Sequence, residues 1–71
     1  MLDVTTETIT VKGMTCDGCV NSVTKALKGV SGVEKADVDL AGQKATVTFD
    51  DSKTNLAALK EAVEEAGYDA D

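Results

Sequence analysis

The chain has 71 residues, of which 42% are hydrophobic and 28% are charged. A chain of this length forms one domain, expected over residues 1–71, and its core is too small to enclose a deep substrate cavity. Its seven Lys and thirteen acidic residues give a net charge of −6. Nucleic acid and anionic membrane surfaces are disfavoured as partners, because both are negatively charged and only Phe49 and Tyr68 could stack on bases.

The sequence also bears on location. No apolar run approaches the roughly 18 residues that a membrane-spanning helix needs. Residues 1–7 have neither the basic segment nor the apolar segment of a signal peptide. We therefore expect a cytoplasmic protein, in a compartment where thiols stay reduced.

The first half of the chain predicts a strand followed by a helix. Residues 7–11 alternate between apolar and polar side chains and are rich in β-branched residues, which is typical of a half-buried strand. Gly13 ends this strand, and residues 14–18 form a loop. Apolar residues then recur at the helical period, at Val20, Val23, Leu27 and Val30. We expect Gly29 to end this helix in a left-handed conformation.

The second half predicts a hairpin, a second helix and a short strand. Two alternating runs, residues 33–40 and 45–49, are joined by a short link that contains glycine, which is typical of a hairpin. The polar loop 50–55 offers three candidate helix N-caps, Ser52, Thr54 and Asn55. Apolar residues at helical spacing follow, at Leu56, Leu59, Val63 and Ala66. Gly67 ends this helix, and residues 68–70 can add a short edge strand.

The element order βαββαβ predicts an α+β fold of the ferredoxin-like type. Four antiparallel strands form one sheet in this fold, and both helices cover the same face of the sheet. Such a sandwich of two layers buries one side of each element, as the apolar patterns require.

Cys16 and Cys19 form a Cys-x-x-Cys motif between the first strand and the first helix. Residues three apart at such a junction can turn both sulfur atoms toward one point. The helix N-terminus carries unpaired N–H groups and a partial positive charge, which favour thiolate over thiol, particularly at Cys19. The sequence therefore predicts two accessible thiolates that converge.

Four interpretations of this pair compete. A closed zinc site needs four ligands, whereas the chain has two Cys, no His and only Asp17 as a nearby oxygen donor. A thioredoxin-like dithiol would need a larger fold and the prolines that this chain lacks. Burial of both thiols as small core residues disagrees with their polar neighbours, Thr15, Asp17 and Gly18. A two-thiolate site for Cu(I) or Hg(II) fits best, because these soft ions accept two sulfur atoms in a near-linear arrangement.

Residues 13–19, Gly-Met-Thr-Cys-Asp-Gly-Cys, resemble the Gly-Met-x-Cys-x-x-Cys signature of the heavy-metal-associated domain family. The similarity continues through the helix, residues 32–33, residues 36–40 and residues 66–69, and covers nearly the whole chain. The family contains copper chaperones, mercury carriers and N-terminal domains of metal-transporting P-type ATPases. The chain looks most like the bacterial copper chaperones, although Asp17-Gly18 stands where many of them carry a histidine.

The resemblance implies a role for each residue near the motif. Cys16 and Cys19 would be the metal ligands, and the side chain of Met14 would pack beneath the loop. Tyr68 matches an aromatic residue near the metal in bacterial chaperones, or alternatively covers only the core. Met14, Thr15 and Tyr68 would thus surround the ligands without bonding to the ion.

The expected function is that of a cytosolic copper(I) chaperone, which is not an enzyme. It would bind one Cu(I), or Hg(II) or Zn(II) in vitro, and pass the Cu(I) by thiolate exchange to a copper-transporting P-type ATPase or a copper-responsive regulator. We expect a monomer without metal and a metal-bridged dimer as its other state. The alternatives are a domain excised from a copper or mercury transporter, which Met1 and a complete fold disfavour, and a dithiol–disulfide redox protein.

Overall fold

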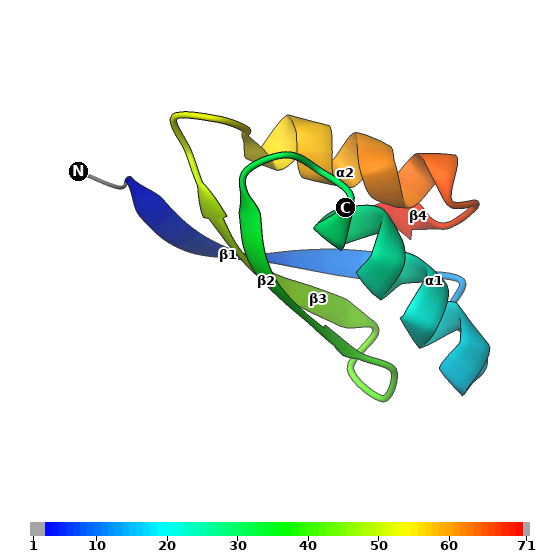
Figure 1. Ribbon diagram of the computed structural model, residues 1–71. Coiled ribbons are helices and arrows are strands. Elements are labelled where there is room, and N and C mark those ends of the chain that lie inside the picture. The colour runs from blue at the N-terminus through cyan, green and yellow to red at the C-terminus, as the bar shows by residue number, and fades with distance from the viewer. Residues whose placement is uncertain (1–2, 71) are drawn as a thin grey trace.

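The computed structural model describes residues 3–70, which form one four-stranded antiparallel sheet and two helices (Figure 1). In chain order the elements are β1 (Val4–Lys12), α1 (Asp17–Lys28), β2 (Val33–Asp39), β3 (Lys44–Asp50), α2 (Leu56–Glu65) and β4 (Asp69–Ala70). The strand order across the sheet is β2-β3-β1-β4. The predicted βαββαβ order and ferredoxin-like fold are therefore confirmed.

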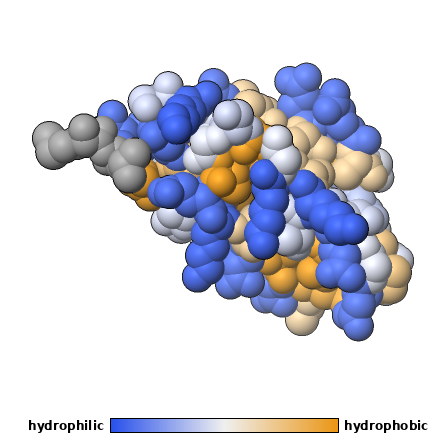
Figure 2. All heavy atoms as spheres, in the orientation of Figure 1, coloured by the Kyte–Doolittle hydropathy of each residue, from blue (hydrophilic) through white to orange (hydrophobic). Residues whose placement is uncertain are grey.

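The hydrophobic core lies between the two helices and one face of the sheet. Its buried apolar residues are Ile9 and Val11 of β1, Met14 of the following loop, Val23 and Leu27 of α1, Ala45, Val47 and Phe49 of β3, and Leu59 and Val63 of α2. The strand members alternate because successive side chains point to opposite faces, and burial of each large aliphatic side chain contributes about 1.5–3 kcal/mol. Hydrophilic residues cover much of the visible surface, with smaller apolar areas between them (Figure 2).

The helix α1 ends at Gly29 as predicted, but its start and the conformation of Gly29 differ from the sequence-based expectation. The helix begins at Asp17, three residues before the apolar period starts, because Cys16 serves as its N-cap in an extended conformation. The prediction of a left-handed Gly29 is wrong, since its φ of −74° and ψ of −12° are right-handed helical. The left-handed conformation occurs instead at Gly32, with φ of 101°. A Cβ on Gly32 would lie 2.8 Å from Cβ of Lys53, so close packing also requires glycine there.

Asn55 is the N-cap of α2, and its Oδ1 accepts a hydrogen bond of 2.9 Å from the backbone N–H of Ala58. We predict that Asn55→Ala lowers the free energy of unfolding by about 0.5–2 kcal/mol, because one N–H of the first turn loses its partner. Urea denaturation monitored by circular dichroism measures this loss. Asn21→Ala, an exposed substitution inside α1, is the control and should cause no comparable loss.

Candidate metal centre

The loop between β1 and α1 is held at both of its ends. Gly13 has φ of 100°, a conformation that glycine adopts without strain, and it turns the chain out of β1. The next side chain, Met14, is 3% exposed and belongs to the hydrophobic core. Cys16 then begins α1 as its N-cap. The loop therefore crosses from the sheet to the helix with its middle anchored in the core.

The two cysteine sulfur atoms converge, as the spacing predicts. The Sγ atoms of Cys16 and Cys19 are 3.5 Å apart, with Cys16 exposed and Cys19 half-buried. The carbonyl of Cys16 accepts hydrogen bonds from the N–H groups of Cys19 at 3.0 Å and Val20 at 3.4 Å. Within the described residues 3–70 the Cys16 side chain caps no backbone N–H, which leaves its sulfur atom available to a ligand.

The surroundings of Cys19 favour its thiolate. A backbone hydrogen bond from Thr15 contributes most, followed by side-chain hydrogen bonds with Tyr68 and Cys16, and together they lower the pKa of Cys19 to about 6. The hydroxyl of Thr15 also lies 3.9 Å from Cys19 Sγ. Partial burial acts in the opposite direction, because it disfavours the charged form. Hydrogen bonding to the anion therefore outweighs its desolvation.

Tyr68 reaches this loop because α2 is followed by a sharp turn. Gly67 has φ of 99°, and β4 then pairs antiparallel with the end of β1, Lys12 opposite Asp69. The ring of Tyr68 lies beside Gly13, where an added Cβ would be 3.7 Å from Cδ1. The hydrogen bond with Cys19 and partial burial raise the pKa of the Tyr68 phenol, which therefore keeps its proton and donates a hydrogen bond to the Cys19 thiolate.

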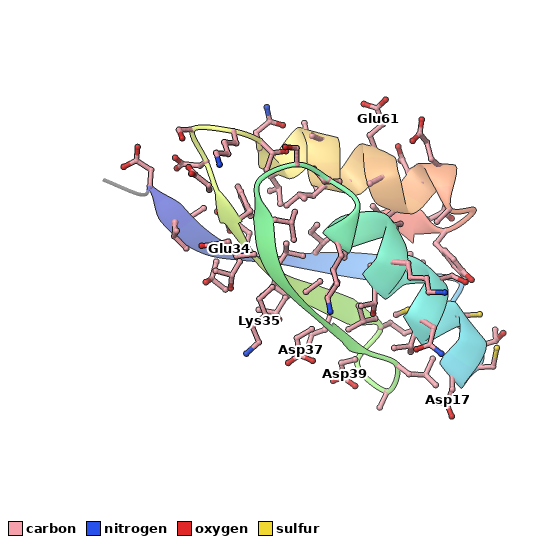
Figure 3. All side chains as sticks on the ribbon, in the orientation of Figure 1. Asp17, Glu34, Lys35, Asp37, Asp39 and Glu61 are labelled. Atoms are coloured by element: carbon pink, nitrogen blue, oxygen red, sulfur yellow. The ribbon has the colours of Figure 1, made fainter. Side chains whose placement is uncertain are left out.

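The remaining metal-ligating side chains stay apart. Within residues 3–70, no group of three or more His, Cys, Asp or Glu side chains is placed to hold an ion. Figure 3 shows that Asp17 projects outward at the start of α1, whereas Asp37 and Asp39 project from β2 and Glu61 projects from α2. The donor set of this loop is accordingly two sulfur atoms, which suits a soft ion of low coordination number.

Two residues near the site were not expected from the sequence to have a role there. Ser22, one turn after Cys19 on α1, forms a side-chain hydrogen bond with Tyr68. Gln43 of the β2–β3 connection donates a hydrogen bond to the Met14 carbonyl. No sequence pattern indicates either role, because serine and glutamine are common surface residues and both contacts depend on the tertiary fold.

The sequence profile of the heavy-metal-associated domain matches residues 8–69, a range that contains the Cys-x-x-Cys loop and both helices. The chain belongs to the heavy-metal-associated domain family. This membership confirms the resemblance that residues 13–19 carry.

Two relatives and one solved structure illustrate the range of this family. The chain is 51% identical over 63 residues to the mercuric transport protein periplasmic component of Salmonella typhi, covering 89% of this chain and 69% of that protein. It is 47% identical over 64 residues to the copper chaperone CopZ of Staphylococcus saprophyticus, covering 90% of this chain and 94% of that protein. The crystal structure of a copper-binding domain from the P-type ATPase HMA7 has a TM-score of 0.92 and 42% identity, covering 93% of this chain and 89% of that chain.

The heavy-metal-associated domain contains no candidate membrane span among its described helices. Neither α1 nor α2 reaches the length and apolar character that a membrane crossing requires.

We predict that the reactivity of Cys19 in this heavy-metal-associated domain follows its lowered pKa. Thiolate is the form that iodoacetamide alkylates, so the rate at Cys19 should fall as the pH decreases through about 6 and level off above it. In urea the midpoint should move up to the free-thiol value of about 8.5. Rates measured by mass spectrometry at Cys19 test this, and a folded midpoint at or above the urea value would contradict it.

The same measurement separates the contribution of Tyr68. Tyr68→Phe removes the second-largest cause of the lowered pKa and should move the midpoint upward by a smaller amount than unfolding does. Ser22→Ala is the control, because it removes a hydrogen bond to Tyr68 while leaving the bond between Tyr68 and Cys19 in place.

Proposed function

We propose that this protein binds one Cu(I) as cargo through the thiolates of Cys16 and Cys19 and transfers it to another protein. The observation that carries the proposal is the pair of sulfur atoms 3.5 Å apart, with no third His, Cys, Asp or Glu gathered beside them in residues 3–70. Cu(I) is satisfied by two thiolates, whereas Zn(II) prefers four ligands. The function is carriage of an ion, and it requires no catalytic group.

Exposure of the loop supports transfer in addition to binding. Cys16 is exposed, so a thiolate of a second protein can approach an ion held there. A bond from the incoming sulfur would form before a bond to Cys16 breaks, and the ion would pass without being released into water. A copper-transporting P-type ATPase is the proposed recipient. The likeness of this chain to the copper-binding domain of the P-type ATPase HMA7 supports a recipient that carries a domain similar to this one.

The exposed site also bears on the oligomeric state of the protein. Two protein loops could share one ion through three or four sulfur atoms, which is the geometry of a transfer intermediate and of a metal-bridged dimer. We propose a monomer without metal, located in the cytosol, where thiols remain reduced. A copper-responsive regulator is a second recipient that the same exchange chemistry would serve.

Mercury transport is the second candidate function. The 51% identity to a mercuric transport protein supports it, and the same two thiolates would hold Hg(II) in a near-linear arrangement. That relative is periplasmic by name, so this candidate also implies a different compartment.

Anaerobic competition titration of the reduced protein tests the copper proposal. The protein competes with a strong Cu(I) chelator, and growth of the ultraviolet thiolate-to-copper band reports binding. We expect one Cu(I) per chain and much weaker retention of Zn(II). Failure to compete for Cu(I), together with tight Hg(II) binding, would replace the copper proposal with the mercury candidate.

The recipient is tested separately by transfer. The copper-loaded protein is mixed with an ATPase metal-binding domain, the two are separated, and copper is measured in each. Transfer should proceed at the same rate with excess free chelator present, because the ion moves within a protein complex. A rate that follows the chelator concentration would mean release into solution and would contradict direct exchange.

A further inference from the structure

Gln43 connects the β2–β3 hairpin to the loop that carries the cysteines. Its Nε2 donates hydrogen bonds to the carbonyl of Met14 at 2.8 Å and to the carbonyl of Leu40 at 3.0 Å. Its own main-chain carbonyl accepts a 2.8 Å hydrogen bond from the N–H of Val11. One residue of the hairpin therefore holds the chain on both sides of Gly13.

The backbone of Gln43 adopts a conformation that glutamine seldom takes. Its φ is 52°, in the left-handed region, and it is the non-glycine residue with positive φ among residues 3–70. A hydrogen bond from its N–H to the Leu40 carbonyl at 3.2 Å already closes the turn. The turn itself thus needs a residue that tolerates positive φ, and it does not need a side-chain amide.

The contact with Met14 has a consequence for the cysteines. Met14 lies two residues before Cys16, and Gly13 in front of it has the conformational freedom of glycine. Fixing the Met14 carbonyl fixes the start of the short segment that leads to Cys16. The side chain of Met14 is held in the core and its peptide is held by Gln43, so the loop has two independent anchors.

We infer that Gln43 is a positioning residue for the metal loop. Its side-chain amide holds the Met14 peptide in place, and the sulfur atoms of Cys16 and Cys19 therefore converge before an ion arrives. The inference rests on the proposed function, because it assigns to the amide a role toward the two proposed ligands. Gln43 touches neither sulfur atom in this scheme and acts through the backbone of the loop.

Gln43→Met is the direct test, because methionine has a similar length and lacks the two N–H donors of the amide. Gln43→Gly also removes the amide but is free of strain at a φ of 52°, so it guards against failure of the first variant to fold. Asn55→Ala is the control, since it also removes side-chain hydrogen bonding to the backbone, one bond where the Gln43 variants remove two. Asn55 lies away from the metal loop. It caps the start of α2, whose ten residues span about 15 Å, whereas Tyr68, which reaches the loop, follows the other end of that helix.

Amide hydrogen exchange of the metal-free protein provides the first readout. Both Gln43 variants should accelerate exchange at Cys19 and Val20, whose N–H groups donate to the Cys16 carbonyl. Val11 should stay protected, because its partner is the main-chain carbonyl of residue 43, which both variants keep. Acceleration at all three amides alike, or at none, would overturn the inference in favour of a role in the hairpin alone.

Cu(I) affinity provides the second readout. Both Gln43 variants should bind Cu(I) more weakly by on the order of tenfold, the effect typical of residues that orient metal ligands, while Asn55→Ala should bind as the wild type does. Equal affinities for all four proteins would overturn the positioning role. If the wild type itself fails to compete for Cu(I), the proposed function is wrong, and amide exchange alone then decides whether Gln43 holds the loop.

Discussion

Replacing either Cys16 or Cys19 with Ser is expected to remove most of the affinity for Cu(I) while the fold remains intact. A serine hydroxyl stays protonated at neutral pH and is a hard oxygen donor, so each variant leaves one soft thiolate for an ion that needs two. Cys16 is exposed and Cys19 is half-buried at the edge of the core, and neither belongs to the buried core residues. Competition with a strong Cu(I) chelator should therefore separate each variant from the wild type, while their urea midpoints stay close.

Thr15→Val is the matched control for these substitutions. Valine has the shape of threonine, and the variant keeps both thiols while removing the hydroxyl that lies 3.9 Å from Cys19 Sγ. We expect its Cu(I) affinity to remain near that of the wild type, because the backbone of Thr15 still bonds to Cys19. A Ser variant that competes for Cu(I) as well as Thr15→Val does would contradict the two-thiolate site.

The fold could be predicted from the sequence wherever one side of an element is buried. Ile9 and Val11 in β1 and Ala45, Val47 and Phe49 in β3 alternate in the sequence and are buried in the structure, because the strand period and the core face coincide. Leu59 and Val63 follow the helical period in the same way. Burial of one face therefore specifies both the type of element and its orientation.

The ends of the elements were harder to predict, because they depend on backbone angles that composition does not determine. Glycine permits positive φ without requiring it, and Gly29 remains right-handed while Gly32 is left-handed. The start of α1 was missed because cysteine is not a usual N-cap and Cys16 caps the helix with its extended backbone alone.

The candidate site was predictable where its residues are close in sequence. Convergence of Cys16 and Cys19 follows from their spacing at the start of a helix, and the sulfur atoms are indeed 3.5 Å apart. The contact between Gln43 and Met14 joins residues 29 positions apart and depends on a left-handed residue in a hairpin turn. No local pattern encodes such a contact, so it could be found only in the folded chain.

Met14→Ala is expected to cause the largest loss of stability in the loop. The Met14 side chain is 3% exposed and packs within the core cluster, so its removal should lower the free energy of unfolding by about 2–5 kcal/mol. Met14→Leu conserves the volume and should cost less than about 1.5 kcal/mol. Urea denaturation of the three metal-free proteins compares these values directly.

The same pair of variants decides whether Met14 bonds to the ion. Because the thioether is buried in the core, we expect the X-ray absorption spectrum of copper-loaded Met14→Leu to match that of the wild type, with two sulfur neighbours in each. Cu(I) affinity of Met14→Leu should likewise be close to that of the wild type, whereas Met14→Ala should lose affinity through loosening of the loop. A spectrum that loses a sulfur neighbour in Met14→Leu would make Met14 a third ligand, and would mean that the loop rearranges to bring the thioether out of the core when copper binds.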